Sequence, residues 1–155
     1  MKMTYKDLIK DLLNKGLIKK QELATGQIKN LLNRAKKDLV VAKHNLEFDE
    51  EVAYNYAYLS MLRCGRALMF LKGYRPIDGQ QHKTVIEIAD MVLGKEFRTL
   101  TKKFDIMRRK RNQFTYDPLL PVSKQEAENA LKSADEFVAS IIVLVQKENP
   151  QSVYN

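Results

Sequence analysis

The sequence is poor in residues that bind metals or cross-link chains, with one cysteine, Cys64, and two histidines, His44 and His82. One cysteine cannot form a disulfide within the chain, and two isolated histidines provide no ligand cluster for zinc. Residues 73–80 also lack the glycine spacing of a phosphate-binding or dinucleotide-binding loop. We therefore expect no metal and no cofactor, and a reducing cytoplasm as the compartment.

Turn-forming residues and long apolar runs are also scarce. Six glycines and four prolines in 155 residues are too few for the many hairpins of a β-sandwich. The longest apolar stretch, residues 137–145, has about half of the roughly 20 residues needed to cross a bilayer. The N-terminus mixes lysine and aspartate with apolar residues, so no export signal is visible. We expect a soluble, all-α protein with no membrane contact.

Apolar residues recur every three or four positions through most of the chain, which is typical of amphipathic helices. Thr4 with Asp7 predicts a capped helix that ends before Gly16. The other expected helices are 27–46, 50–72, 82–93, one from residue 97 to the Asp117–Pro118 step, and one that follows an N-cap at Ser123.

These elements predict an up-and-down bundle of four to five helices with a short N-terminal helical appendage. We expect one domain over residues 1–155. Its parts are the appendage in residues 1–24, the bundle in 27–147 and a frayed tail in 149–155. The helix of residues 50–72 is apolar on nearly every side and should be central. Residues 73–80 are the clearest loop.

Positive charge is concentrated in one segment. The net charge is +8, and residues 98–111 contain seven basic residues against one acid, Asp105. Such a segment favours contact with a polyanion such as RNA. The negative end of a helix dipole would stabilise the same charges, so the run alone does not establish binding.

Arg111 occupies a position where the helical period requires an apolar side chain. Its stripe is Phe97, Leu100, Phe104, Met107, Arg111 and Phe114. An unpaired guanidinium in a core costs several kcal/mol. Arg111 must therefore pair with a carboxylate, extend along its stem to solvent, or line a cleft that accepts an anion.

Polar side chains surround Arg111 on the expected helix. Arg108, Asn112 and Tyr116 follow one another at four-residue spacing, which places them on one side of the helix. Arginine binds phosphate oxygens in a planar fork, asparagine orients a hydroxyl, and tyrosine donates a hydrogen bond or stacks on a base. We predict a phosphodiester site with Arg111, Asn112 and Tyr116 as candidate catalytic residues. The residues expected to attract the polyanion are Arg108, Arg109 and Lys110.

A second polar cluster interrupts the apolar central helix. Asn55 and Arg66 are eleven residues apart, about three turns, and so project to the same side. Together with Arg63 they either face the cleft of Arg111 or pair with acids of a neighbouring helix. His82 follows the predicted loop, where a lone histidine is more often a cap or surface residue than a base.

Several short motifs follow one another along the chain. They are Asn33-Arg34-Ala35, residues 53–62, Arg66-Ala67-Leu68, a glycine loop, Gln81-His82-Lys83, Arg111-Asn112 with Tyr116-Asp117, and Glu136-Phe137-Val138. Their order, over residues 27–146, resembles the HEPN (higher eukaryotes and prokaryotes nucleotide-binding) superfamily, and within it the small stand-alone prokaryotic branch with an Arg-x4-Tyr motif.

The resemblance implies a four- or five-helix bundle that dimerises and brings two copies of the Arg111 motif into a shared cleft. Many members are metal-independent ribonucleases, often toxins encoded beside a minimal nucleotidyltransferase that acts as antitoxin. They use an arginine, then a polar residue and, a few positions later, a histidine. Arg111 and Asn112 match the opening of this motif, but Tyr116 stands where the histidine would be. Because tyrosine is a poor proton acceptor near neutral pH, this departure puts cleavage in doubt.

We predict a homodimeric HEPN-type protein that binds RNA or a nucleotide at Arg111, Asn112 and Tyr116. It would act as a weak metal-independent ribonuclease or as a toxin-like partner of a nucleotidyltransferase that modifies Tyr116. Asn55 and Arg66 are further predicted nucleic-acid-binding residues. The alternatives are a protein-interaction bundle in which Arg111 is a structural ion-pair residue, and a sensor that binds a small nucleotide between Arg66 and Arg111.

Overall fold

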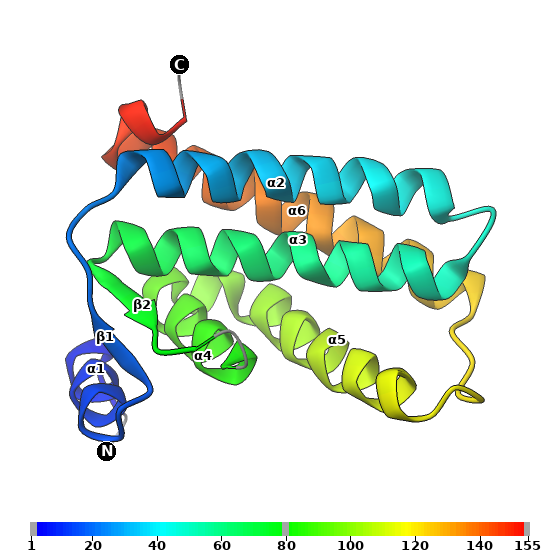
Figure 1. The fold of residues 1–155 in the computed structure, drawn as a ribbon, viewed down its shortest axis with the longest axis horizontal. Helices are drawn as coiled ribbons and strands as arrows, with labels where there is room; N and C mark the ends of the chain where they lie inside the picture. Colours follow the sequence, from blue (N-terminus) through cyan, green and yellow to red (C-terminus); the bar gives the residue numbers. More distant parts are fainter. Residues whose placement is uncertain (1–2, 79–80, 154–155) are drawn as a thin grey trace.

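The computed structural model describes residues 3–78 and 81–153 (Figure 1). The α-helices of this part are α1 (Tyr5–Asn14), α2 (Thr25–Asn45), α3 (Glu50–Leu71), α4 (His82–Leu93), α5 (Arg98–Tyr116) and α6 (Lys124–Glu148). Short elements are the strands β1 (Ile18–Lys20) and β2 (Tyr74–Pro76) and the 3-10 helices η1 (Lys95–Phe97) and η2 (Pro150–Ser152). The predicted all-α bundle is confirmed. No helix within these ranges has the length and apolar character needed to span a bilayer.

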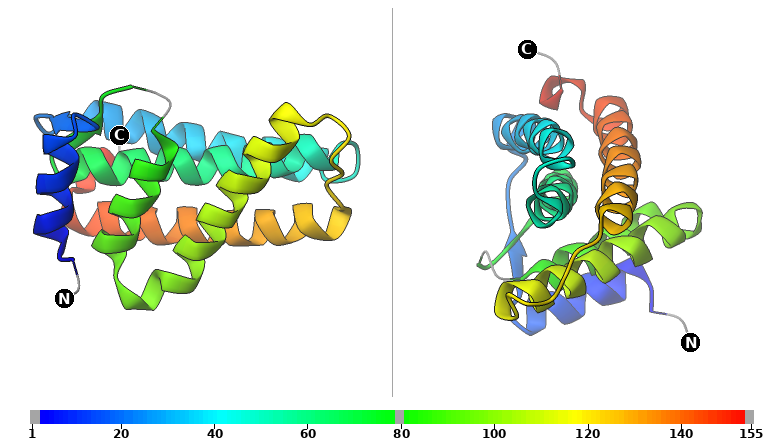
Figure 2. Two further views of the ribbon diagram at one scale, coloured as in Figure 1. Left: turned by 90° about the horizontal axis from the view of Figure 1, so that it is seen from below. Right: turned by 90° about the vertical axis from the view of Figure 1, so that its right-hand side faces the viewer.

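Helix α3 is the centre of the bundle and contacts α2, α4, α5 and α6. Helices α2, α3 and α6 run side by side, with α3 and α6 in the same direction and α2 in the opposite one (Figure 1). Helices α4 and α5 form a V that crosses the other three obliquely (Figure 2). The N-terminal helix α1 packs against α4. The α2–α3 turn and the α5–α6 connection lie at the same end of the bundle (Figure 1).

An aromatic cluster holds α3, α5 and α6 together. Tyr58, Phe104 and Phe137 are fully buried, and the ring centroid of Phe104 lies 5.8 Å from that of Tyr58 and 5.2 Å from that of Phe137. Such pairs contribute roughly 0.5–1.5 kcal/mol beyond burial itself. Between α3 and α4, Gly65 permits a close approach, because a Cβ there would lie 2.5 Å from Cγ1 of Val85. These contacts fix the relative positions of α3, α4 and α5.

The helix ends carry the signals expected from the sequence. Thr4 and Asp7 form a reciprocal capping box on α1, and Ser123 forms one on α6 with Glu126. Helix α4 stops before Gly94, whose φ of 78° favours glycine. Helix α5 ends at Tyr116, shortly before the predicted proline break.

The two strands were not predicted. β1 and β2 pair in antiparallel orientation, with Lys19 opposite Arg75. The prediction of a loop over residues 73–80 is therefore wrong for residues 74–76, and residues 79 and 80 lie outside the described residues. A strand of three residues is too short to show an alternating pattern, and its partner is distant in the sequence.

The C-terminal segment differs from the expected frayed tail. η2 packs against α2 and α6, and Ser152 is fully buried. Its hydroxyl donates a hydrogen bond to Oδ1 of Asn149 at 2.9 Å, which holds the turn after α6. Residues 154 and 155 lie outside the described part of the chain.

Candidate functional site

Helix α5 presents one charged side chain on an otherwise apolar face. The buried residues of its stripe are Leu100, Phe104, Met107 and Phe114. Arg111 occupies the remaining position, between Met107 and Phe114, and is half-buried. Because this stripe packs in the core, it fixes the rotation of α5 about its axis and therefore the direction in which the Arg111 side chain projects.

Two residues of α3 hold the Arg111 side chain. Its Nε donates a hydrogen bond to Oδ1 of Asn55 at 3.1 Å. Its Cζ lies 5.9 Å from the ring centroid of Tyr58, within the range of a cation–π contact. Among residues 3–78 and 81–153, no carboxylate forms an ion pair with Arg111. Because an amide neutralises no charge, the guanidinium remains able to attract an anion.

Arg111 lines a hollow of about 250 Å³ between the end of α5 and the start of α4, which we call the basic hollow. Its lining residues are Gln81, His82, Lys83, Arg108, Arg111, Asn112, Thr115 and Tyr116. Three of these side chains are cationic and none is a carboxylate. The charge of the basic hollow therefore suits an anion such as phosphate.

A hollow of about 260 Å³ is lined by Glu87, Asp90 and Asp105 among other residues. Two larger hollows also have less suitable charge. One of about 500 Å³ also contains Arg111, but Asp49 and Glu51 line it and would repel a phosphate. The other, of about 440 Å³ between α5 and α6, is lined by two lysines and two glutamates among other residues. We therefore take the basic hollow as the candidate site because its lining is positively charged, although other hollows are larger.

The buried hydroxyl of Tyr58 reaches His82 at the basic hollow. The Tyr58 oxygen lies 2.8 Å from Nδ1 of His82, and the ring centroids are 5.8 Å apart. Burial raises the pKa of the Tyr58 hydroxyl, although the charges of Arg111, Arg108 and Arg66 oppose this shift. The phenol therefore stays protonated near neutral pH.

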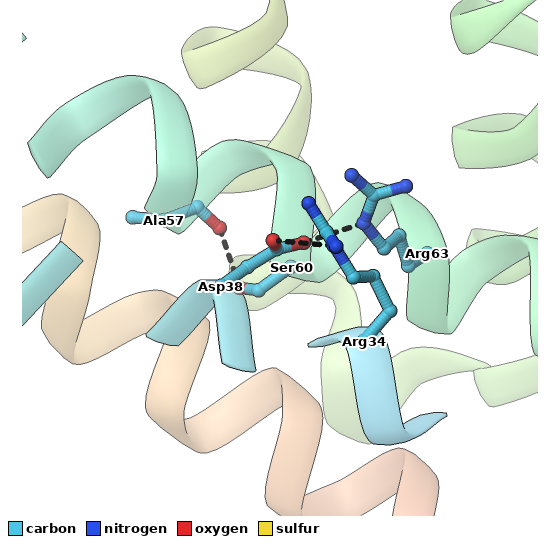
Figure 3. A network of polar contacts seen from close by, with 5 residues as sticks. All are labelled: Arg34, Asp38, Ala57, Ser60 and Arg63. Atoms are coloured by element: carbon cyan, nitrogen blue, oxygen red, sulfur yellow. Dashed lines mark hydrogen bonds and ion pairs between the residues drawn. The ribbon is translucent and has the colours of Figure 1, made fainter. Parts of the chain in front are cut away.

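Arg63 on α3 forms an ion pair with a buried carboxylate, which Arg111 does not do within the described residues. Its Nε donates to Oδ2 of Asp38 at 2.5 Å, and Asp38 is fully buried. The Nε of Arg34 lies 3.4 Å from the other oxygen of the same carboxylate (Figure 3). The interpretation that arginines of the central helix pair with an acid of a neighbouring helix therefore holds for Arg63.

Of the three consecutive basic residues 108–110 of α5, only the first lines the basic hollow. Arg108 lines the basic hollow, and its Nε lies 2.9 Å from Oδ1 of Asp105. Arg109 also pairs with Asp105, at 3.3 Å, and its side chain is 63% exposed. Lys110 donates to a backbone carbonyl of the α5–α6 connection at 3.1 Å. Neither Arg109 nor Lys110 lines the basic hollow.

The remaining predicted residues differ in exposure. Asn112 and Tyr116 are exposed at the basic hollow, Tyr116 by 86%. Arg66 is half-buried on α3, and burial, with the nearby charge of Arg63, lowers its pKa. The sequence did not single out Tyr58, because one tyrosine among many aromatic residues of an apolar helix is indistinguishable from core.

The side chains of the basic hollow can bind a phosphate and carry a proton. Guanidinium and ammonium groups donate to phosphate oxygens, and His82 adds an imidazole, a type of side chain that ordinarily exchanges a proton near neutral pH. In the described ranges, no group of three or more His, Cys, Asp or Glu side chains is placed to hold a metal ion.

A model of the HEPN domain matches residues 28–144, which is most of the chain. The match contains every residue of the basic hollow. Comparisons with curated proteins and with solved structures gave no match. The domain match supports a function related to nucleotides or RNA at the level of the family. By the extent of this match, the chain belongs to the HEPN domain family.

Proposed function

We propose that this HEPN domain binds RNA through the phosphodiester backbone in the basic hollow, with Arg111 as the main phosphate ligand. The observation that carries the proposal is the state of the Arg111 guanidinium. It is half-buried, held by the neutral amide of Asn55, and open to a hollow that contains Lys83 and Arg108. Arginine in this state offers planar paired donors to phosphate oxygens.

The neighbouring side chains have distinct roles in this proposal. Asn112, exposed at the rim, orients the phosphate or a nearby 2′-hydroxyl. Tyr116 stacks on a base or donates a hydrogen bond. Arg108 adds charge inside the hollow, while Arg109 and Lys110 attract the polyanion from outside it.

Two residues of α3, Asn55 and Arg66, support the site without lining the basic hollow. Asn55 positions Arg111 through the hydrogen bond described above. Arg66 adds positive potential, since its charge reaches the hydroxyl of Tyr58. The competing proposal, an interaction bundle in which Arg111 is a structural ion-pair residue, is disfavoured because that role belongs to Arg63 with Asp38.

In its enzymatic form, the proposal is a weak metal-independent ribonuclease. Arg111 would stabilise the charge on the reacting phosphate, and Asn112 would orient the attacking 2′-hydroxyl. The new P–O2′ bond forms as the P–O5′ bond breaks, and one proton moves from the 2′-oxygen to the 5′-oxygen. The products are a 2′,3′-cyclic phosphate and a 5′-hydroxyl end. Because Tyr116 replaces the histidine of related ribonucleases, we expect slow turnover.

We also propose a homodimer whose two basic hollows open to one cleft. HEPN domains commonly dimerise. Phe48, Tyr116 and Leu119 are 86%, 86% and 89% exposed, and they belong to the segments that meet at one end of the bundle (Figure 1). Light scattering should give twice the mass of 18.0 kDa. A monomer at every concentration would contradict the dimer.

A second candidate role is that of a toxin-like partner of a minimal nucleotidyltransferase, with Tyr116 as the modified residue. The 86% exposure of Tyr116 favours it, because a modifying enzyme must reach the hydroxyl. Mass spectrometry of protein isolated from cells that contain its natural genomic neighbours should then detect a nucleotidyl group on Tyr116. An unmodified Tyr116 under those conditions contradicts this role.

The central experiment compares RNA binding by wild type, Arg111→Ala and Lys37→Ala. Lys37 is exposed on α2, so its substitution removes the same charge away from the hollow. With a labelled single-stranded RNA at low salt, Arg111→Ala should lose about tenfold or more in affinity. Lys37→Ala should lose less than about twofold, and wild-type affinity should fall steeply with salt as counterions are released.

Wild type and Arg111→Ala are also used to test whether the bound RNA is cleaved. Incubation with RNA in the presence of a chelator should give slow cleavage by wild type and none by Arg111→Ala. Binding without cleavage by wild type would remove the enzymatic form and retain RNA binding. Absence of RNA binding by wild type at low salt would contradict the proposed function and favour the interaction bundle.

A further inference from the structure

His82 contributes an imidazole to the lining of the basic hollow. It is the first residue of α4, it is half-buried, and its Nδ1 lies 2.8 Å from the hydroxyl of Tyr58. Imidazole is the side chain whose charge ordinarily changes between about pH 5 and 8. The contact with Tyr58 therefore links a buried residue of α3 to a group that can take up a proton at the RNA site.

We propose that His82 is a second phosphate ligand of the basic hollow, that Tyr58 holds its ring in position, and that RNA binding strengthens when His82 is protonated. This inference rests on the proposed function, because it assigns a further ligand to the same RNA phosphate.

Tyr58 favours one of the two neutral forms of the His82 ring. Its hydroxyl is buried, and burial raises its pKa, so it remains an O–H donor. When the ring is neutral and this hydroxyl donates to Nδ1, the ring hydrogen resides on Nε2. When the ring is protonated, Nδ1 donates to the Tyr58 oxygen and Nε2 keeps its hydrogen. In both states Nε2 is a donor, as a phosphate oxygen requires.

The surrounding charges couple protonation of His82 to phosphate binding. Among the described residues, those that line the basic hollow or act on Tyr58 include four cations, Arg66, Lys83, Arg108 and Arg111, and one acid, Asp105, which pairs with Arg108 and Arg109. Without an anion, these cations disfavour a positive imidazole. A bound phosphate offsets part of this positive potential and therefore favours protonation. Proton and RNA should therefore bind cooperatively, so that lower pH gives tighter binding.

The chain contains two histidines, which provides a matched control. His44 is exposed on α2, away from the residues that line the basic hollow. The affinity for a short labelled single-stranded RNA is measured at constant ionic strength for wild type, His82→Gln and His44→Gln between about pH 5.5 and 8. Wild type and His44→Gln should gain about tenfold as the pH falls. His82→Gln should show an affinity that does not change with pH.

Nitrogen NMR of the imidazole rings tests the part assigned to Tyr58. Wild type should show the Nε2–H form of His82 at neutral pH. Tyr58→Phe keeps the aromatic ring and removes the hydroxyl, so it should lose this preference and much of the pH-dependent gain. Its affinity at about pH 8, where imidazole is ordinarily neutral, should remain dependent on Arg111.

Each contrary result has a distinct meaning. If His82→Gln follows the pH profile of wild type while Arg111→Ala abolishes binding, the role of His82 is overturned and the proposed function stands. An Nδ1–H form in wild type overturns the role of Tyr58. If wild type binds no RNA at low salt at any pH in the range, the proposed function itself fails, and this inference fails with it.

Discussion

Nε of Arg111 on α5 lies 3.1 Å from Oδ1 of Asn55 on α3, although the two residues are 56 positions apart. The hydrogen bond fixes one end of a long side chain and leaves its charge uncompensated. A guanidinium held in this way loses less conformational entropy when a phosphate binds, since side-chain ordering costs up to about 2 kcal/mol. In the proposed RNA-binding role, the amide of Asn55 would hold Arg111 ready for a phosphate, whereas a carboxylate partner would neutralise its charge.

Substitution of Asn55 should weaken RNA binding through Arg111. Asn55→Ala removes one hydrogen bond, worth about 1 kcal/mol, and should lower RNA affinity by about fivefold. Asn55→Asp should lower it further, because the new carboxylate would pair with the guanidinium. The test is a double-mutant cycle in a binding assay, in which Asn55→Ala should have no effect in an Arg111→Ala background. An equal loss in both backgrounds would show that Asn55 does not act through Arg111.

The two possible roles of Tyr116 can be separated by paired substitutions. A side chain that is 86% exposed at the rim of the basic hollow is well placed to stack on an unpaired base. Tyr116→Phe should therefore bind RNA within about twofold of wild type, and Tyr116→Ala should lose about fivefold to tenfold. Equal losses in the two variants would instead assign a hydrogen bond from the hydroxyl.

The helices were predictable because each has a local signal. The Thr4 and Ser123 caps and the break after Tyr116 each lie within a few residues of the end that they define. Arg111 was conspicuous for a similar reason, since it interrupts a regular stripe. The hydrogen bond between Tyr58 and His82 spans 24 positions, and the β1–β2 pairing joins segments still further apart. No local pattern encodes such contacts, because they depend on how α3 and α4 pack.

Asp38 should contribute strongly to stability and little to RNA binding. Its carboxylate is 1% exposed and lies between Arg63 and Arg34. Asp38→Ala leaves Arg63 without a partner and should lower the free energy of unfolding by about 3 kcal/mol. Arg34→Ala should cost less than about 1 kcal/mol, because the Arg34 side chain is 50% exposed. Urea denaturation measures both losses.

The double variant Asp38→Leu with Arg63→Met is the control for this ion pair. An apolar pair in place of a buried ion pair is often neutral, so the double variant should recover most of the stability that Asp38→Ala loses. RNA affinity of the folded double variant should remain within about twofold of wild type. A loss of RNA binding comparable to that of Arg111→Ala would show that Arg63 also contacts the RNA.

Gly65 sets the distance between α3 and α4, and a single methyl group should disturb it. In a helix interior, Gly→Ala ordinarily stabilises by about 1 kcal/mol. At Gly65 the new Cβ would lie 2.5 Å from Cγ1 of Val85, and overpacking of this kind costs roughly 1–3 kcal/mol. Gly65→Ala should therefore reduce stability, whereas Gly26→Ala, with no atom within 4 Å of its Cβ, should be neutral or stabilising.

Val85→Ala provides the rescue, because it removes the methyl group that the new Cβ would strike. In urea denaturation, the double variant Gly65→Ala with Val85→Ala should lose less stability than the two single losses combined. Additive losses would place the cost of Gly65→Ala elsewhere than at Val85. Since α4 begins at His82, a shift of α4 away from α3 should also lengthen the contact with Tyr58. The His82 NMR signals of folded Gly65→Ala should therefore move, and those of Gly26→Ala should not.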